Sequence, residues 1–178
     1  MSRRGGGLAG GLGLAVLLAV GACADGGGTA GRADGGAGGP PQYLPVSARW
    51  CLPEGACVGL EVPKLPRQYA WGLQMRPALP PLRGMWFSFS PPAPARFWMH
   101  RTLAPLDMVF VRDGRVVAIE AAVPPCARLP CPSYGPVLPV DGVVELGAGR
   151  AAALGIGVGT PVRIESLTPS FPAAPARD

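Results

Sequence analysis

Apolar residues recur from residue 43 onward in short runs, several of which alternate with polar residues. Runs of this length and period, bounded by Gly, Pro and Asp, are typical of β-strands. They predict eight strands, over residues 43–50, 56–62, 84–89, 95–102, 107–112, 115–123, 142–146 and 160–165. Asp113-Gly114 joins two of these runs and is a strong signal for a tight hairpin. Two further segments, 66–75 and 149–154, predict short helices.

Many short strands at near-regular spacing, with few helices, are typical of β-sandwiches and β-barrels. We expect a mainly β single domain over residues 42–168, an antiparallel sandwich or barrel of jelly-roll-like form with one or two short helices. All twelve aromatic residues lie beyond residue 40, whereas 15 of the 27 glycines lie before it. The part that carries the aromatic residues is long enough for one hydrophobic core but not for two.

The N-terminal part has a different pattern. Arg3 and Arg4 precede an apolar stretch, Leu8 to Val20, which is too short to span a membrane and is typical of a secretory signal. Small residues then lead to Cys23, in the manner of a bacterial lipobox. We expect residues 1–23 to be a signal peptide that ends in a lipidated Cys23. The alternative is an ordinary signal peptide with a chance cysteine.

Two segments lack the side chains needed to form a core. Residues 24–41 are rich in Gly and contain no aromatic or large apolar residue, so we expect a flexible tether between a membrane-held end and the domain. Residues 169–178 are rich in Pro and Ala, and we expect a disordered tail. This organisation predicts an exported protein that is anchored by lipid at the cell envelope.

Charge narrows the possible partners. The formal net charge is +5, but the 15 arginines and one lysine are scattered, without a basic run. Proteins that bind nucleic acid usually gather these residues on one face, so we expect no nucleic-acid partner. We also expect a monomer without a cofactor.

Four cysteines follow the predicted signal: Cys51, Cys57, Cys126 and Cys131. In an exported protein, two pairs that are close in sequence indicate disulfides. Three connectivities are possible, and we favour the local bridges 51–57 and 126–131. A four-cysteine zinc site is the alternative, although structural zinc sites usually have two to four residues between paired ligands and the gaps here are five and four.

One motif resembles a nucleotide-binding sequence, but too few residues follow it for a nucleotide-binding fold. A predicted strand runs into Gly147-Ala148-Gly149-Arg150-Ala151-Ala152, which matches G-x-G-x-x-A, and Glu165 follows at the spacing of a ribose-binding acid. Glycines end any helix there after about six residues, and barely 30 residues remain for the rest of a doubly wound sheet. We interpret the segment as a strand followed by a short helical turn.

Several blocks of the chain resemble those of a known family. In order, they are GLQMR (72–76), RGMWF (83–87), FWMHRTLAPLD (97–107), VFVRDGRVVAI, PPCARLPCPSYGP and VVELGAGRAAALGIGVGTPV. They resemble the signature blocks of the domain of unknown function 192 (DUF192) family over about residues 72–165, and the block with two cysteines is similar to cyanobacterial members. The resemblance implies a small sandwich-like β protein, often exported or lipid-anchored, without a settled activity.

The chain departs from the family pattern at three positions. His100 and Arg101 stand where members commonly carry a lysine or similar residue and an asparagine. Trp71 stands where a smaller residue is usual. If the asparagine amide is a recognition feature of the family, its replacement by Arg101 alters that site.

The candidate binding residues are Arg76, Trp98, His100, Arg101, Asp107 and Glu145. Alternate residues of a strand share a face, so Trp98 and His100 would form one wall of a shallow groove, with Asp107 as a polar anchor. The alternative places Trp98 in the core, His100 at an exposed edge and Asp107 in a turn. Arg76 and Glu145 flank apolar blocks and could pair with each other, and such pairs are usually structural.

Enzyme chemistry has few candidate residues. The chain has one His, no G-x-S-x-G motif and no His cluster for a catalytic metal. We therefore expect a non-catalytic binding or scaffolding module whose partner is an envelope glycan, a small molecule or another envelope protein. The alternative is a small extracytoplasmic, glycan-directed hydrolase that uses two carboxylates from Asp107, Asp113, Glu120 and Glu145.

Overall fold

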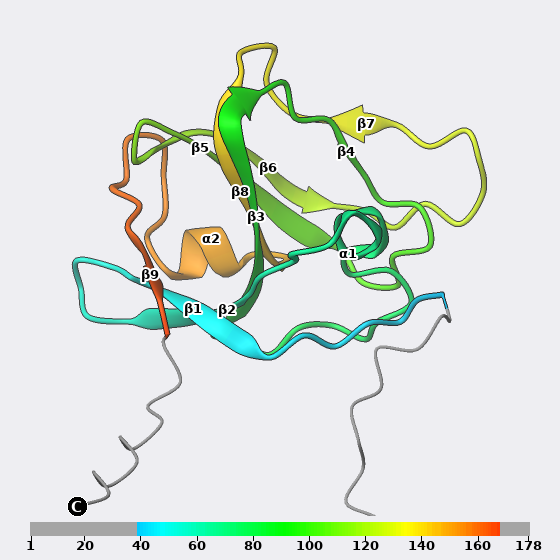
Figure 1. The fold of residues 1–178 in the computed structure, drawn as a ribbon, viewed down its shortest axis with the longest axis horizontal. Helices are drawn as coiled ribbons and strands as arrows, with labels where there is room; N and C mark the ends of the chain where they lie inside the picture. Colours follow the sequence, from blue (N-terminus) through cyan, green and yellow to red (C-terminus); the bar gives the residue numbers. More distant parts are fainter. Residues whose placement is uncertain (1–38, 168–178) are drawn as a thin grey trace, which may run out of the picture. The chain divides into compact units, whose positions relative to one another are not determined.

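The computed structural model describes residues 39–167, which form nine strands and two short helices (Figure 1). The strands are β1 Val46–Cys51, β2 Cys57–Glu61, β3 Arg83–Ala93, β4 Phe97–Trp98, β5 Leu106–Arg112, β6 Arg115–Val123, β7 Ser133–Tyr134, β8 Val140–Gly147 and β9 Ile164–Ser166. The helices are α1 Pro66–Trp71 and α2 Arg150–Ala153. A mainly β domain with two short helices is therefore confirmed. The expected signal peptide with Cys23, most of the expected tether and the expected tail lie outside the described residues.

Seven strands form one open sheet in the order β6-β5-β8-β3-β2-β1-β9, and β4 pairs with β7 separately. All neighbours in the large sheet are antiparallel except β2 and β3, which run parallel. The sheet is therefore mixed rather than wholly antiparallel. A parallel pair needs a long crossover connection, and the chain between Glu61 and Arg83, which contains α1, supplies it. An isolated bridge between Arg115 and Pro161 joins β6 to the segment before β9.

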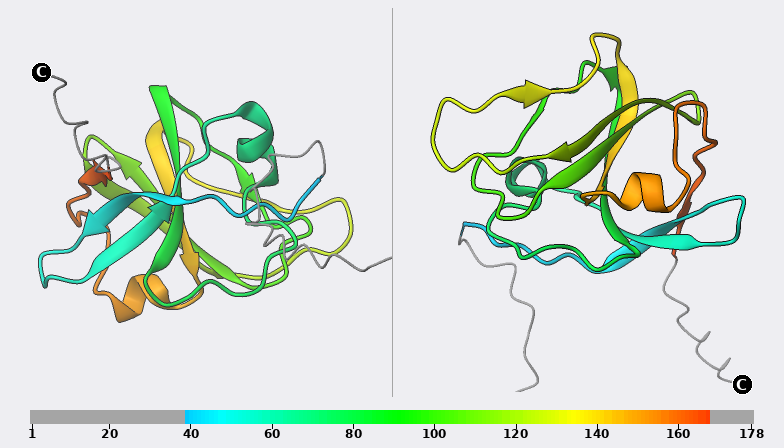
Figure 2. Two further views of the ribbon diagram at one scale, coloured as in Figure 1. Left: turned by 60° about the horizontal axis from the view of Figure 1, so that its bottom comes forward. Right: turned by 180° about the vertical axis from the view of Figure 1, so that it is seen from behind.

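The large sheet is covered on both faces. Trp86, Val144 and Leu146 contribute to one hydrophobic cluster, which also contains Ala151 of α2. Met85 and Val143, on the same strands, contribute to a second cluster with Leu73, which follows α1. We call the side of the sheet with the first cluster the α2 face and the side with the second cluster the α1 face. Figure 2 shows the sheet and the two helices in two further views. Burial on both faces explains why residues 106–111 of β5 are all buried and read as an uninterrupted apolar run apart from Asp107.

The local turns follow from their residues. Asp113 and Gly114 have φ values of 49° and 68°, as the two-residue hairpin between β5 and β6 requires. Helix α1 begins with Pro66, and the side-chain oxygen of Gln68 accepts the N–H groups of Lys64 and Leu65. It ends at Trp71, before Gly72, whose φ of 47° favours glycine, so the helix is shorter than the predicted 66–75.

The predicted strand over residues 95–102 is wrong in extent, because only Phe97 and Trp98 belong to a strand. The chain then turns at Arg101, which has a φ of 58°. His100 keeps a single bridge to Cys126. Strand β7, which pairs with β4, was not among the predicted strands.

The favoured cysteine pairing is confirmed, since Cys51 lies at disulfide distance from Cys57 and Cys126 from Cys131. The first pair joins directly opposed residues of β1 and β2. Within residues 39–167, no group of three or more His, Cys, Asp or Glu side chains could hold a metal ion. In the same part of the chain, no helix is both long and apolar enough to cross a membrane.

Candidate functional site

A small pocket opens on the α1 face, between helix α1 with its following loop, strands β3 and β4, and strand β8. Its volume is about 40 Å³, enough for a few atoms. Five of its lining residues are aromatic, namely Tyr69, Trp71, Phe87, Phe97 and Trp98. The lining also contains Glu145 and Thr102. We call this feature the aromatic pocket.

Glu145 enters the aromatic pocket from the centre of the sheet. It lies opposite Met85 of β3 on one side and Met108 of β5 on the other, and both methionines are fully buried. Glu145 itself is only 5% exposed. Among the described residues, its carboxyl group has no hydrogen-bond or ion-pair partner. A partnerless acid at the base of an apolar pocket is the feature that most distinguishes this site.

The surroundings of Glu145 change its acidity. Burial raises the pKa of the Glu145 carboxyl from 4.5 to about 8, because the apolar environment disfavours the charged form. The acid is therefore mainly protonated at neutral pH, and it can donate one hydrogen bond. At slightly higher pH it becomes a carboxylate that can bind a cation.

The aromatic wall is ordered by edge-to-face contacts. The ring centroid of Phe87 lies 5.9 Å from that of Tyr69 and 5.0 Å from that of Phe97. Phe97 continues the series to Phe110, at 6.3 Å. Contacts of this geometry stabilise the rings in addition to the effect of burying them. The wall of the pocket that Phe87 and Phe97 form is therefore a fixed part of the core.

Trp98 lies at the rim of the pocket and is 49% exposed. The interpretation that buries Trp98 in the core is therefore wrong. Its ring lies 5.3 Å from that of His100, so the two residues share a side, as the alternation of a strand predicts. His100 itself does not line the pocket.

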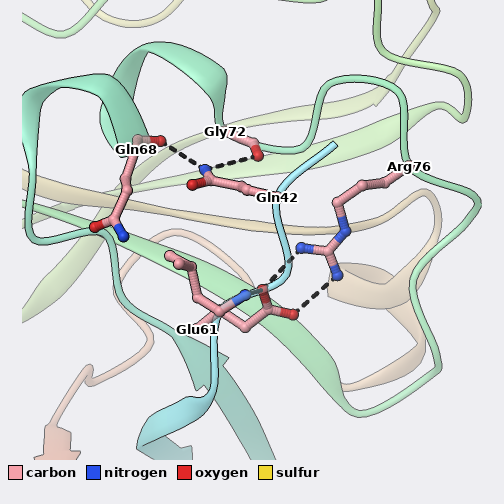
Figure 3. Close-up of polar contacts among 6 residues, drawn as sticks. Gln42, Glu61, Gln68, Gly72 and Arg76 are labelled. Atoms are coloured by element: carbon pink, nitrogen blue, oxygen red, sulfur yellow. Dashed lines mark hydrogen bonds and ion pairs between the residues drawn. The ribbon is translucent and has the colours of Figure 1, made fainter. Parts of the chain in front are cut away.

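The outer wall, residues 69–74, is held by a polar cluster behind it (Figure 3). The side-chain nitrogen of Gln42 donates to the carbonyl oxygens of Gln68, at 2.7 Å, and Gly72, at 3.1 Å. The carboxylate of Glu61 accepts the N–H of Leu44 at 3.0 Å, close to Gln42 in the chain. These contacts tie the wall to the chain that enters β1.

Arg76 belongs to this polar cluster, and it pairs with Glu61 rather than with Glu145. Its two terminal nitrogens donate to the two oxygens of Glu61, at 2.8 and 2.9 Å, and both side chains are buried. The ring of Tyr43 covers the guanidinium, with its centroid 4.7 Å away. A two-pronged pair of this kind fixes orientation as well as charge. Arg76 is therefore a positioning residue for the wall of the aromatic pocket.

Asp107 lies on the opposite face of the sheet from the aromatic pocket. It is 1% exposed, and its carboxylate accepts the N–H groups of Ala122 at 2.8 Å, Gly149 at 3.1 Å and Ala151 at 2.9 Å. These partners are distant in sequence, so Asp107 is not the local turn residue of the alternative interpretation. Its carboxylate fills the position at the start of α2 where the G-x-G-x-x-A motif would hold a phosphate.

Residues 52–164 match DUF192, a family described as uncharacterized ACR. The chain belongs to the DUF192 family. No curated protein matches it.

Two solved structures are similar to this DUF192 chain. One is a protein of unknown function from Novosphingobium aromaticivorans, with 33% identity, a TM-score of 0.58, and coverage of 66% of this chain and 83% of that one. The other is described as a "putative transcription regulator" from Sinorhizobium meliloti, with 30% identity, a TM-score of 0.59, and coverage of 72% and 98%.

The backbone at Arg101 bears on the asparagine that the family resemblance implies at this position. Arg101 has a φ of 58°, in the left-handed region that Asn tolerates better than most residues. Its carbonyl accepts the N–H of Met75 and its N–H donates to the carbonyl of Cys126. The side chain itself is exposed. The asparagine that the family resemblance implies at this position would suit the turn.

The variant Arg101→Asn is expected to raise the free energy of unfolding by about 0.5–1 kcal/mol, because it relieves part of the left-handed strain. Urea unfolding at neutral pH measures the change. Arg163→Asn is the control, since Arg163 is also exposed but has no positive φ. A loss of stability in Arg101→Asn equal to that in the control would contradict the conformational explanation.

Proposed function

We propose that this DUF192 domain is a non-catalytic binding module whose aromatic pocket receives one small group of a larger ligand at Glu145. The observation that carries the proposal is the buried Glu145 carboxyl, which has no partner among the described residues and lines a pocket. The carboxyl oxygens of Glu145 are not among the enclosed polar atoms that lack a partner in residues 39–167, so they remain accessible from the pocket. A ligand that enters the pocket would supply the missing partner.

The shape of the pocket supports a module that binds one end of a ligand. Sites for whole small molecules usually enclose about 300–1,000 Å³, whereas the aromatic pocket has about 40 Å³. The half-exposed ring of Trp98 at the rim offers a surface for the rest of the ligand. The ligand would thus be an envelope glycan, a small molecule or a partner protein that projects a single group inward.

The proposal includes the location that the N-terminal sequence predicts. A lipidated Cys23 followed by the tether of residues 24–41 would hold the domain at the membrane surface of the cell envelope. The two local cysteine pairs at disulfide distance support an oxidising compartment. The binding face would then be free to meet ligands of the envelope.

The alternative, a hydrolase with two carboxylates, has weaker support. Glu120 and Glu145 both lie opposite Met108, so they share the α1 face with one strand between them. Glu120 does not line the aromatic pocket, however. Asp107 is on the other face, and its carboxylate accepts three backbone N–H groups. Among residues 39–167, Glu145 is therefore the one acid that lines the pocket.

Titration of the ¹⁵N-labelled full-length chain with a library of small polar fragments tests the binding proposal. We expect amide shift changes at residues 69–74 and around Trp98, because these residues line the pocket. Trp98→Ala is expected to weaken the best fragment about tenfold or more, since exposed aromatic residues at a binding site contribute strongly.

Leu129→Ala is the matched control for Trp98→Ala, because Leu129 is 60% exposed and does not line the pocket. Fragment shifts that fall elsewhere, or an equal effect of both substitutions, would refute the binding proposal. Cleavage of envelope glycan fragments that is lost in both Glu120→Ala and Glu145→Ala would favour the hydrolase instead.

A further inference from the structure

We propose that the group received by the aromatic pocket is a primary ammonium, the protonated end of an alkylamine or of a lysine-like chain. This inference rests on the proposed binding function and names the chemical class of its ligand. It also applies when the ligand is a protein that presents a lysine.

The lining of the pocket suits a cation. Aromatic rings attract an ammonium group through the negative potential of their faces, and five aromatic residues surround the pocket. Glu145 supplies the opposite charge, and the lining contains no Lys, Arg or His. A volume of about 40 Å³ accommodates an ammonium with its first methylene but not a bulky quaternary group.

No positively charged side chain of the described residues pairs with Glu145. Arg76, which the sequence suggested as a partner of Glu145, instead donates from its two terminal nitrogens to Glu61. An isolated carboxylate in apolar surroundings is costly unless it is paired. When Glu145 ionises, a ligand ammonium would provide the ion pair that residues 39–167 do not.

The titratable groups around Glu145 are few. Helix α1 contributes Tyr69 to the lining, and β4 leads to His100, which contacts Trp98 rather than the pocket. Strand β6 contributes Glu120, beyond Met108. Strands β3 and β5 contribute only the neutral Met85 and Met108 next to Glu145. Of the carboxyl groups on these elements, Glu145 is the one that lines the pocket.

The protonation state of Glu145 gives the affinity for an ammonium a distinctive dependence on pH. Burial raises the pKa of the carboxyl to about 8, so binding of a cation at lower pH must first release a proton. Affinity for an ammonium should therefore rise between pH 6.5 and 8.5, on the order of tenfold, as the ionised fraction increases. A neutral hydrogen-bond acceptor would show the reverse, because it needs the protonated acid.

Calorimetric titration of the full-length chain with n-propylammonium, and with n-propanol as its neutral counterpart, tests the proposal at pH 6.5 and 8.5. Both pH values keep the amine protonated. We expect n-propylammonium to bind at least tenfold more tightly than n-propanol at pH 8.5. Glu145→Gln should abolish this preference, whereas Glu120→Gln, on the same face but outside the pocket, should keep it. Circular dichroism confirms that both variants are folded.

Each contrary outcome has a separate meaning. Equal affinity for the two probes, or a preference for n-propylammonium that survives Glu145→Gln, would overturn the ammonium as the ligand class. If the fragment library still shifts the pocket residues in that case, the proposed binding function stands. If neither the library nor either probe shifts them, both the ligand class and the proposed function fall.

Discussion

Replacement of Asp107 by alanine is expected to lower the free energy of unfolding by about 3–5 kcal/mol. The substitution leaves three backbone N–H groups, of Ala122, Gly149 and Ala151, without their acceptor. A buried donor that loses its partner costs about 1–3 kcal/mol. Because these donors belong to β6 and to the start of α2, the loss should loosen both elements on the α2 face.

Urea unfolding without reductant measures the effect of Asp107→Ala. Glu165→Ala is the matched control, since Glu165 also has a charged partner, Arg49, but in an exposed pair. Exposed pairs contribute about 0–1 kcal/mol, so the control should change little. A cost of less than 1 kcal/mol for Asp107→Ala would show that the carboxylate is not the link between these segments.

The role of Asp107 shows that a residue of a family motif need not belong to a ligand site. Asp107 ends the most specific block of the family resemblance, FWMHRTLAPLD. Within that block, Phe97, Trp98 and Thr102 line the aromatic pocket, whereas Asp107 is buried on the opposite face. One motif can therefore combine residues that form a site with a residue that holds the fold together.

Much of the fold could be predicted from patterns among residues that are close in the sequence. The period of two placed Trp98 and His100 on one side, and Asp113-Gly114 marked the hairpin between β5 and β6. The cysteine pairs closed short loops, so their connectivity followed from spacing. The parallel pairing of β2 with β3 was not predictable in this way, because it depends on where the whole 62–82 connection returns to the sheet.

The polar partners of the candidate residues were the least predictable part. Arg76 pairs with Glu61, 15 positions earlier, and Asp107 accepts from Ala151, 44 positions later. Such partners are fixed by the closure of the fold and leave no period in the sequence. Glu145 did carry a signal, since a single acid interrupts the apolar run Val143-Val144-Glu145-Leu146. That pattern indicates an acid buried between strands, although it does not show the aromatic pocket in front of it.

Glu145→Gln is expected to stabilise the domain above pH 4.5, by an amount that grows with pH. The folded protein keeps the Glu145 proton up to a pKa of about 8, whereas the unfolded chain releases it near 4.5. The wild-type domain therefore loses stability as pH rises through this window, because folding must either take up a proton or bury a charge. The full shift corresponds to at most about 5 kcal/mol. Glutamine has nearly the same shape and carries no charge, so it avoids this penalty.

Urea unfolding of the two proteins at pH 4, 6 and 8 measures the difference directly, and groups that titrate in both proteins cancel. We expect almost equal stability at pH 4 and a clear advantage of the variant at pH 8. Glu165→Gln, on the exposed surface, should instead follow the wild-type dependence on pH. A constant difference between Glu145→Gln and the wild type at all three pH values would mean that folding leaves the pKa of Glu145 near 4.5. The carboxyl would then be ionised in the folded protein at neutral pH, and the expected rise in ammonium affinity between pH 6.5 and 8.5 would be lost.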